Sequence, residues 1–124
     1  MQAELVELAR YRLEKAKECL RDAQDAALES RLANSVNRSY YSMFHATRAL
    51  LALSGFDSQK HSSIIGYFNQ HYVAKGEIDP VYHQMLSNAF RVRNKTDYDD
   101  FFFVSRDEAE QQLDNAVKFV AALE

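Results

Sequence analysis

The sequence predicts an all-α protein, an up-and-down antiparallel bundle of about five helices. Three glycines and one proline in 124 residues leave few points where a helix must break. Apolar residues recur three and four positions apart, the spacing that places side chains on one face of a helix. The segments between the predicted helices are short, so consecutive helices should pack antiparallel. The length fits one core, and we expect a single domain over residues 1–124.

The first predicted helix covers residues 3–28 and the second covers residues 32–53. The first helix carries a narrow apolar seam of the kind found in bundles, made of Val6, Ala9, Leu13, Ala16, Leu20, Ala23 and Ala27. The second helix carries a wider apolar arc, made of Val36, Tyr40, Met43, Phe44, Thr47, Leu50 and Leu51. Because a wide arc can contact two neighbours, we expect the second helix at the centre of the bundle.

Glycine and proline delimit the third and fourth helices. Gly55 closes the second helix, and Asp57 or Ser58 can cap the third. The core face of the third helix comprises Ile64, Ile65, Phe68 and Tyr72. Gly76 closes this helix, and Pro80 fits the first turn of the fourth because no amide proton is needed there.

A capping box at Ser105 and Glu108 predicts the start of the fifth helix. The apolar face of this helix comprises Ala109, Leu113, Ala116, Val120 and Leu123. Three adjacent phenylalanines, residues 101–103, precede it and cannot all face one core. We therefore expect at least one of them to contact another chain or to cover the end of the bundle.

Charge and cysteine content restrict the class of protein. The net charge is −3, yet residues 31–75 carry five Lys and Arg residues against Asp57 alone. This segment could face an anion, or it could be a solvated surface balanced by the acidic helices. No stretch approaches the ~18 apolar residues of a membrane span, and we expect no signal peptide. A lone Cys19 suits a reducing compartment, so we expect a cytoplasmic protein.

Arg93 occupies the apolar face of the fourth predicted helix. Helical spacing places it on the face formed by Tyr82, Leu86, Ala89 and Phe90. A guanidinium aimed at a core needs a carboxylate, a phosphate or several acceptors, because an unpaired buried charge is very unfavourable. Asp97 and Tyr98 follow within five residues, and Asp97 can pair with Arg93 at helical spacing. Residues 93–100 are therefore the strongest candidate for a site, either as a buried Arg-Asp-Tyr network or as a ligand site.

A polar stripe on the second helix supplies further candidates. Opposite the apolar arc, three-and-four spacing aligns Arg38, Tyr41, His45 and Arg48. Such a stripe could hold a phosphodiester, or it could be a polar surface with a few tertiary hydrogen bonds. His61 lies near the start of the third helix, where the helix dipole lowers imidazole basicity and favours the neutral form that a general base needs. Lys60 beside it would suit an anion. Both histidines could equally be structural.

Residues 39–46, 60–62 and 93–101, in this order, resemble the HEPN domain family. The similarity is greatest to small stand-alone bacterial and archaeal HEPN proteins. This resemblance implies a helical bundle that dimerises, RNA as a frequent target, and a small nucleotidyltransferase as a frequent partner, the pair acting as toxin and antitoxin. We expect no membrane partner.

Many HEPN toxins are metal-independent ribonucleases that use an arginine followed, after four to six residues, by a histidine. The resemblance places Arg93 at the arginine position, but Tyr98 stands where the histidine belongs, and no histidine follows His83. An unperturbed tyrosine titrates near ~10 against ~6.5 for histidine, so Tyr98 is a poor base at neutral pH.

Two main hypotheses follow. In the first, the protein is a catalytically degenerate module that binds a nucleotide or RNA, or docks a nucleotidyltransferase. In the second, it is a metal-independent endoribonuclease toxin in which Arg93 holds the phosphate and His45 or His61 moves the proton. A scaffold whose only product is the dimer, formed through the aromatic run, is a third possibility. The spacing of Asp97, Asp99 and Asp100 matches no calcium loop or zinc pattern, so we expect no metal and no cofactor.

Overall fold

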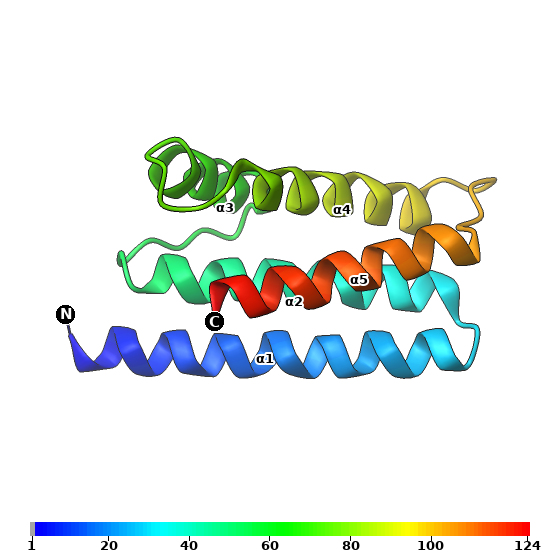
Figure 1. Cartoon of the computed structure of the whole chain (residues 1–124), viewed down its shortest axis with the longest axis horizontal. Helices are drawn as coiled ribbons and strands as arrows, with labels where there is room; N and C mark the ends of the chain where they lie inside the picture. The colour runs from blue at the N-terminus through cyan, green and yellow to red at the C-terminus, as the bar shows by residue number, and fades with distance from the viewer. Residues whose placement is uncertain (1) are drawn as a thin grey trace.

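The computed structural model describes residues 2–124 and shows a bundle of five α-helices and one π-helical segment, without a strand in that range (Figure 1). The elements are α1 (Ala3–Leu28), α2 (Leu32–Ala52), α3 (His61–Phe68), η1 (Asn69–Val73), α4 (Pro80–Tyr98) and α5 (Arg106–Leu123). Along the long axis, α1, α2, α4 and α5 alternate in direction, and α3 lies beside the start of α4 at one end (Figure 1). The prediction of an all-α, up-and-down bundle is confirmed. No helix in residues 2–124 combines the length and the apolar character needed to cross a membrane.

The helix α2 is the central element of the bundle, as predicted. It contacts α1, α3, α4 and α5. Its buried side chains form one core with residues of the other helices, and the largest of these that are fully buried include Tyr40, Met43, Phe68, Leu86 and Phe119. Each apolar side chain of this size contributes about 1.5–3 kcal/mol when it is buried. The residues of the predicted polar stripe of α2 are half-buried, and Tyr41 among them packs against this core.

Most helix ends lie where the sequence places them. The first helix has the predicted bounds, and the second ends at Ala52, one residue before the predicted end. Pro80 is the first residue of α4, and Asp79 caps the helix by accepting a hydrogen bond from the Val81 N–H at 2.9 Å. Gly55 and Gly76 adopt φ angles of 73° and 81°, a left-handed conformation that glycine accommodates without strain.

The capping box at α5 is present in one direction. The Ser105 hydroxyl accepts a hydrogen bond from the Glu108 N–H at 3.0 Å. The Glu108 carboxylate accepts one from Gln112 Nε2 at 3.1 Å, one turn further along, and is not bonded to the Ser105 amide within the described chain. The local pattern therefore locates the start of α5 correctly, although only the serine acts as the cap.

The prediction that Asp57 or Ser58 caps the third helix is wrong. Lys60 is the N-cap residue, and no side chain caps α3. The Ser58 hydroxyl accepts a hydrogen bond from the Lys60 N–H at 3.1 Å, before the helix begins. Two guanidinium groups attract the Asp57 carboxylate away from the helix end. The predicted third helix is also interrupted, because the α-helix ends at Phe68 and η1 follows it.

The aromatic run before α5 is largely exposed. Phe101 and Phe103 are 92% and 85% exposed, whereas Phe102 is half-buried. The Lys95 ammonium lies 5.8 Å from the centroid of the Phe102 ring. The three phenylalanines do not share the core, as expected. That one of them contacts another chain stays a prediction.

Candidate functional site

Arg93 is directed into the bundle at the contact between α2 and α4. Its side chain is only 13% exposed. Its Nη2 donates a hydrogen bond to Tyr41 Oη at 2.8 Å, and its Nη1 donates one to Asn94 Oδ1 at 3.0 Å. Its Nε lies 3.0 Å from Asp97 Oδ2, but the N–H does not point at that oxygen, so this contact is an ion pair without a directed hydrogen bond. Each guanidinium nitrogen therefore lies close to a polar atom of the chain itself, but only Nη1 and Nη2 donate hydrogen bonds within residues 2–124.

Three phenol rings surround the Arg93 guanidinium. Its central carbon lies 5.1 Å from the ring centroid of Tyr41 and 5.7 Å from those of Tyr40 and Tyr98. A guanidinium within about 6 Å of an aromatic ring is attracted by the electron-rich face of the ring. Tyr98 itself is 70% exposed. Solvent, and hence a ligand, can reach Tyr98 far more easily than Arg93.

Asp97 connects Arg93, on α4, to a second arginine, Arg38, which lies on α2. Its Oδ2 accepts a hydrogen bond from Asn37 Nδ2 at 3.0 Å, and Asn37 Oδ1 accepts two from Arg38, at 3.0 and 2.6 Å. The Arg38 guanidinium also lies 5.0 Å from the centroid of the Tyr41 ring. We call these five residues, Asn37, Arg38, Tyr41, Arg93 and Asp97, the Arg93 cluster. Its two guanidinium groups and one carboxylate leave one positive charge unbalanced.

Asn37 is the member of the Arg93 cluster that sequence reasoning missed. It lies one helical turn before Tyr41 and next to Arg38, so its position on the polar side of α2 was visible in the sequence. Its contact with Asp97 joins residues that are 60 positions apart, so this contact was not visible in the sequence.

His61 is held in one tautomer by Tyr40. The imidazole stacks on Phe44 with the centroids 4.2 Å apart, and its Nδ1 lies 2.7 Å from Tyr40 Oη. Tyr40 is fully buried, and burial raises the pKa of its hydroxyl far above the ordinary value. The hydroxyl has no other hydrogen-bond partner in the described chain, so it must donate to Nδ1 to avoid a buried unpaired proton. The neutral imidazole then carries its own proton on Nε2.

The electrostatic surroundings of His61 also favour the neutral form. Burial lowers its pKa first, and the positive charges of Arg93 and Arg48 lower it further. A neutral imidazole with its proton on Nε2 offers an N–H donor there, whereas a general base would need a free lone pair. The geometry thus favours a hydrogen-bond donor at His61 over the general base that sequence reasoning proposed.

His45 is a neutral, half-buried histidine on the polar stripe of α2. Its ring lies 5.9 Å from the ring of Tyr41, centroid to centroid. Burial and then four cations lower its pKa to about 4, the cations being Lys15, Arg48, Arg38 and Arg12. Its buried Nδ1 has no hydrogen-bond partner within residues 2–124, and no hydrogen bond joins it to Arg93 there. His45 therefore lies in a positive region next to the Arg93 cluster and outside it.

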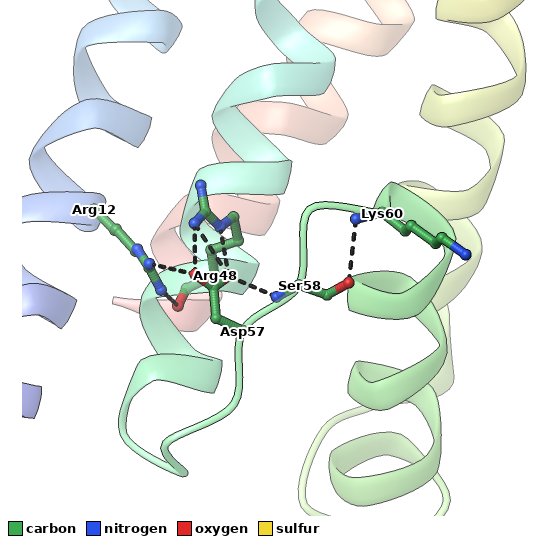
Figure 2. A network of polar contacts seen from close by, with 5 residues as sticks. All are labelled: Arg12, Arg48, Asp57, Ser58 and Lys60. Carbon is green, nitrogen blue, oxygen red and sulfur yellow. Dashed lines mark hydrogen bonds and ion pairs between the residues drawn. The ribbon is translucent and has the colours of Figure 1, made fainter.

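Arg48 and Lys60 belong to a different part of the surface. Arg48 and Arg12 both bind Asp57, as Figure 2 shows. In the same view the Lys60 ammonium extends away from this network. The predicted phosphate-binding residues thus separate into Arg38, Tyr41 and Asp97 in the Arg93 cluster, Arg48 in a second cluster, and Lys60 in neither. Arg12 was not predicted, because nothing in the sequence distinguishes it from the other charged residues of α1.

An open hollow lies on the solvent side of Tyr98, lined by Phe90, Arg91, Asn94, Lys95, Tyr98 and Asp99. Its exposed lining is mainly apolar, and Arg91, Lys95 and Asp99 contribute two cations and one carboxylate to it. Within residues 2–124, no group of three or more His, Cys, Asp and Glu side chains is arranged to hold a metal ion. This hollow is suited to stacking of a flat ring on Tyr98. Arg38 lines a separate hollow, together with Asp22, Asp25, Ala26, Arg31 and Asn34.

The bundle and its buried arginine define a class of small α-helical proteins with a polar cluster where α2 and α4 meet. The chain belongs to the HEPN domain family, whose model matches residues 9–124. It is 30% identical over 114 residues to a UPF0332 protein of Thermotoga maritima, covering 92% of this chain and 86% of the relative. A UPF0332 protein of Pyrococcus horikoshii is 48% identical over 59 residues, 48% of this chain and 42% of that protein. A Methanocaldococcus jannaschii protein named as a candidate toxin is 29% identical over 101 residues, which are 82% of this chain and 69% of the relative.

Proposed function

We propose that this chain is the HEPN component of a toxin-type system and that it binds RNA at the Arg93 cluster without cleaving it. The observation that carries the proposal is the state of Arg93, which is 13% exposed, is paired with the Asp97 carboxylate and donates hydrogen bonds to Tyr41 and Asn94. An arginine that stabilises a reacting phosphate must direct N–H groups at it. Arg93 instead supports Tyr41 and Tyr98. The ligand contacts then fall to Tyr98 and to Arg38, whose guanidinium, in the part of the chain that the structure describes, binds only the neutral Asn37 and Cys19 and so keeps an uncompensated charge.

The histidines support binding without turnover. His61 presents an N–H donor on Nε2, and the pKa of His45, about 4, keeps that imidazole neutral. Neither is hydrogen bonded to Arg93 within the described residues. Tyr98 occupies the position of the motif histidine, and an ordinary phenol is a weak base at neutral pH.

A protein partner is part of the same proposal. Relatives named as candidate toxins support a role in a toxin-type system. By its resemblance to stand-alone HEPN proteins, the chain would pair there with a small nucleotidyltransferase. The exposed rings of Phe101 and Phe103 are consistent with a contact between two copies of the chain in a homodimer. The exposed Tyr98 hydroxyl would be open to modification by the partner.

Fluorescence anisotropy with a labelled single-stranded RNA of about 12 nucleotides, in the presence of a chelator, tests the proposal. We expect the RNA to bind and to remain intact on a denaturing gel. Tyr98→Ala should weaken binding by about tenfold, because one base loses its stacking partner, and Tyr98→Phe should bind almost normally. Arg38→Gln should weaken binding, and it should reduce by about one the number of counterions released on binding, as measured from the salt dependence of the affinity. The proposal fails if no RNA binds, or if Tyr98→Ala and Tyr98→Phe bind equally well.

A metal-independent endoribonuclease is the second candidate, and it is favoured by the closeness of Arg93 to His61, whose pKa burial and then the Arg93 charge lower. In this reaction Arg93 would exchange Asp97 for the phosphate, and the attacking 2′-hydroxyl would give its proton to water. His61 would pass its Nε2–H to the leaving oxygen, the Tyr40 hydroxyl would return a proton to Nδ1, and the protonated water would restore the Tyr40 proton. The candidate requires RNA cleavage in chelator that Arg93→Ala and His61→Gln both abolish. Intact RNA bound to the unsubstituted protein after long incubation would exclude it.

A further inference from the structure

Asp57 joins two arginines between α1 and α2, outside the Arg93 cluster (Figure 2). Its Oδ2 lies 3.0 Å from Arg12 Nη2 and 3.0 Å from Arg48 Nη2, and its Oδ1 accepts from Arg48 Nε at 3.3 Å and from Arg48 Nη2 at 3.1 Å. The Ser58 N–H also donates to Oδ1, at 2.8 Å. The carboxylate is therefore held on two sides by guanidinium groups, and Arg48 engages it through Nε and Nη2, one edge of its guanidinium.

The two arginines are fixed more firmly than the carboxylate that joins them. Arg12 and Arg48 extend from packed helices, and the Arg12 side chain is only 10% exposed. Arg12 Nη1 also donates to the Arg48 carbonyl at 3.4 Å, which ties its guanidinium to α2. Asp57 lies on the connection between α2 and α3, and its side chain is 49% exposed. The structure thus contains two preplaced cations with an anion at their solvent edge.

This region keeps a surplus of positive charge even with Asp57 in place. Two guanidinium groups share one carboxylate, and Lys15 and Arg38 add to the positive potential at the neighbouring His45. A guanidinium fork matches the oxygens of a phosphate as well as those of a carboxylate. A phosphate group carries at least as much negative charge, and its approach is not limited by the length of the α2–α3 connection.

We propose that Arg12 and Arg48 form a second phosphate-binding site, which Asp57 fills in the free chain, and that a phosphate group of the ligand replaces the Asp57 carboxylate. Arg38 and Arg48 are ten residues apart on α2, about 15 Å along the helix axis. A single-stranded RNA of several nucleotides spans both arginines, whereas a mononucleotide reaches one. The RNA as the source of the phosphate rests on the proposed function, but the anion site does not.

Inorganic phosphate and the Asp57→Ala variant test the anion site. In chloride this variant leaves Arg12 and Arg48 without their anion, so its melting temperature should fall. In about 20 mM phosphate at equal ionic strength, the melting temperature should rise by about 4 °C, because an ion that binds only the folded chain stabilises it. Asp114→Ala, which removes an exposed carboxylate from α5, is the matched control for net charge. Phosphate should raise the melting temperature of this variant hardly at all. Adding Arg48→Gln to Asp57→Ala should abolish the phosphate effect.

Equal phosphate effects in Asp57→Ala and Asp114→Ala would overturn the proposal and leave an ordinary structural ion pair. Asp57→Asn, which keeps an oxygen for the Ser58 N–H, serves the same test if the alanine variant does not fold. With RNA as the probe, Asp57→Ala should bind roughly fivefold more tightly than Asp114→Ala, since no carboxylate must be displaced. If the two variants bind RNA equally well while the phosphate effect is specific to Asp57→Ala, the anion site is retained. The proposal that RNA supplies its phosphate group is then overturned. Absence of RNA binding in every variant would refute the proposed function instead, and the phosphate measurement would still decide the anion site.

Discussion

Acid should destabilise this protein through His45. Burial and then four cations lower the pKa of its imidazole from 6.5 to about 4, the cations being Lys15, Arg48, Arg38 and Arg12. The folded chain therefore binds a proton at a lower pH than the unfolded chain does. Stability due to the neutral imidazole is complete above about pH 6.5 and is lost as the pH falls through the window down to about 4.

The size of this effect follows from the shift in pKa. A change from 6.5 to about 4 corresponds to at most about 3 kcal/mol of stability between neutral pH and the lower end of the window. His45 is half-buried, so water screens part of the repulsion, and we expect a loss of about 2 kcal/mol at pH 4. The pKa of His61 is lowered as well, so its imidazole adds to the loss in the same direction.

Urea denaturation at pH 7 and at about pH 4.5 in low salt measures this loss. His45→Gln removes the titrating group and keeps a neutral polar side chain on α2, so the variant should lose less than half as much stability as the unsubstituted protein. His83→Gln, on α4, is the matched control, because the His83 imidazole contacts Ser87 on its own helix. It should lose as much as the unsubstituted protein. Equal losses for His45→Gln and His83→Gln would refute the reasoning.

Three further substitutions test the contacts around the candidate site and one helix cap. Arg93→Met should lower the free energy of unfolding, measured in urea, by about 2 kcal/mol, because Tyr41 loses its hydrogen-bond donor and the Asp97 carboxylate loses its cation. A loss below about 0.5 kcal/mol would contradict the bonding described. Tyr40→Phe should raise the pKa of His61, measured by NMR titration, since the hydroxyl that donates to Nδ1 favours the neutral imidazole; an unchanged pKa would contradict the tautomer. Ser105→Ala should lower the free energy of unfolding by about 1 kcal/mol, and no change in the urea midpoint would mean that the cap is dispensable.

Helices were predictable because their signals are local. Pro80 begins α4, and Ser105 caps α5, since each acts on backbone groups within a few residues of itself. The ion pair of Arg93 with Asp97 was predictable for the same reason, because both residues lie on one helix at a spacing of four. Periodicity also identified the buried face of α2. Apolar periodicity does not predict the transition at Phe68, where the α-helix passes into η1, because both kinds of helix can bury the same face.

Contacts between distant residues were beyond local patterns. Asp57 was predicted to cap a helix, yet it pairs with Arg12, 45 residues away, and with Arg48. A sequence shows that a carboxylate is available for capping, but it does not show which cations the fold brings near it. The role of His61 could not be decided from the sequence for a related reason. Its tautomer depends on the direction of one buried hydroxyl, that of Tyr40, which only the packing of α2 against α3 determines.

The two arginine clusters differ in the element that supplies the carboxylate, and this difference separates their functions. Asp97 lies on α4, one turn from Arg93, and Asn37 of α2 also binds it, so helices hold this carboxylate on both sides. Its exposed fraction is 26%, against 49% for Asp57. Displacing Asp97 would disrupt the contact between two packed helices, whereas displacing Asp57 requires movement only of an irregular connection. A phosphate should therefore enter beside Arg48 at lower cost than beside Arg93, which assigns structural support to the buried arginine and anion exchange to the second site.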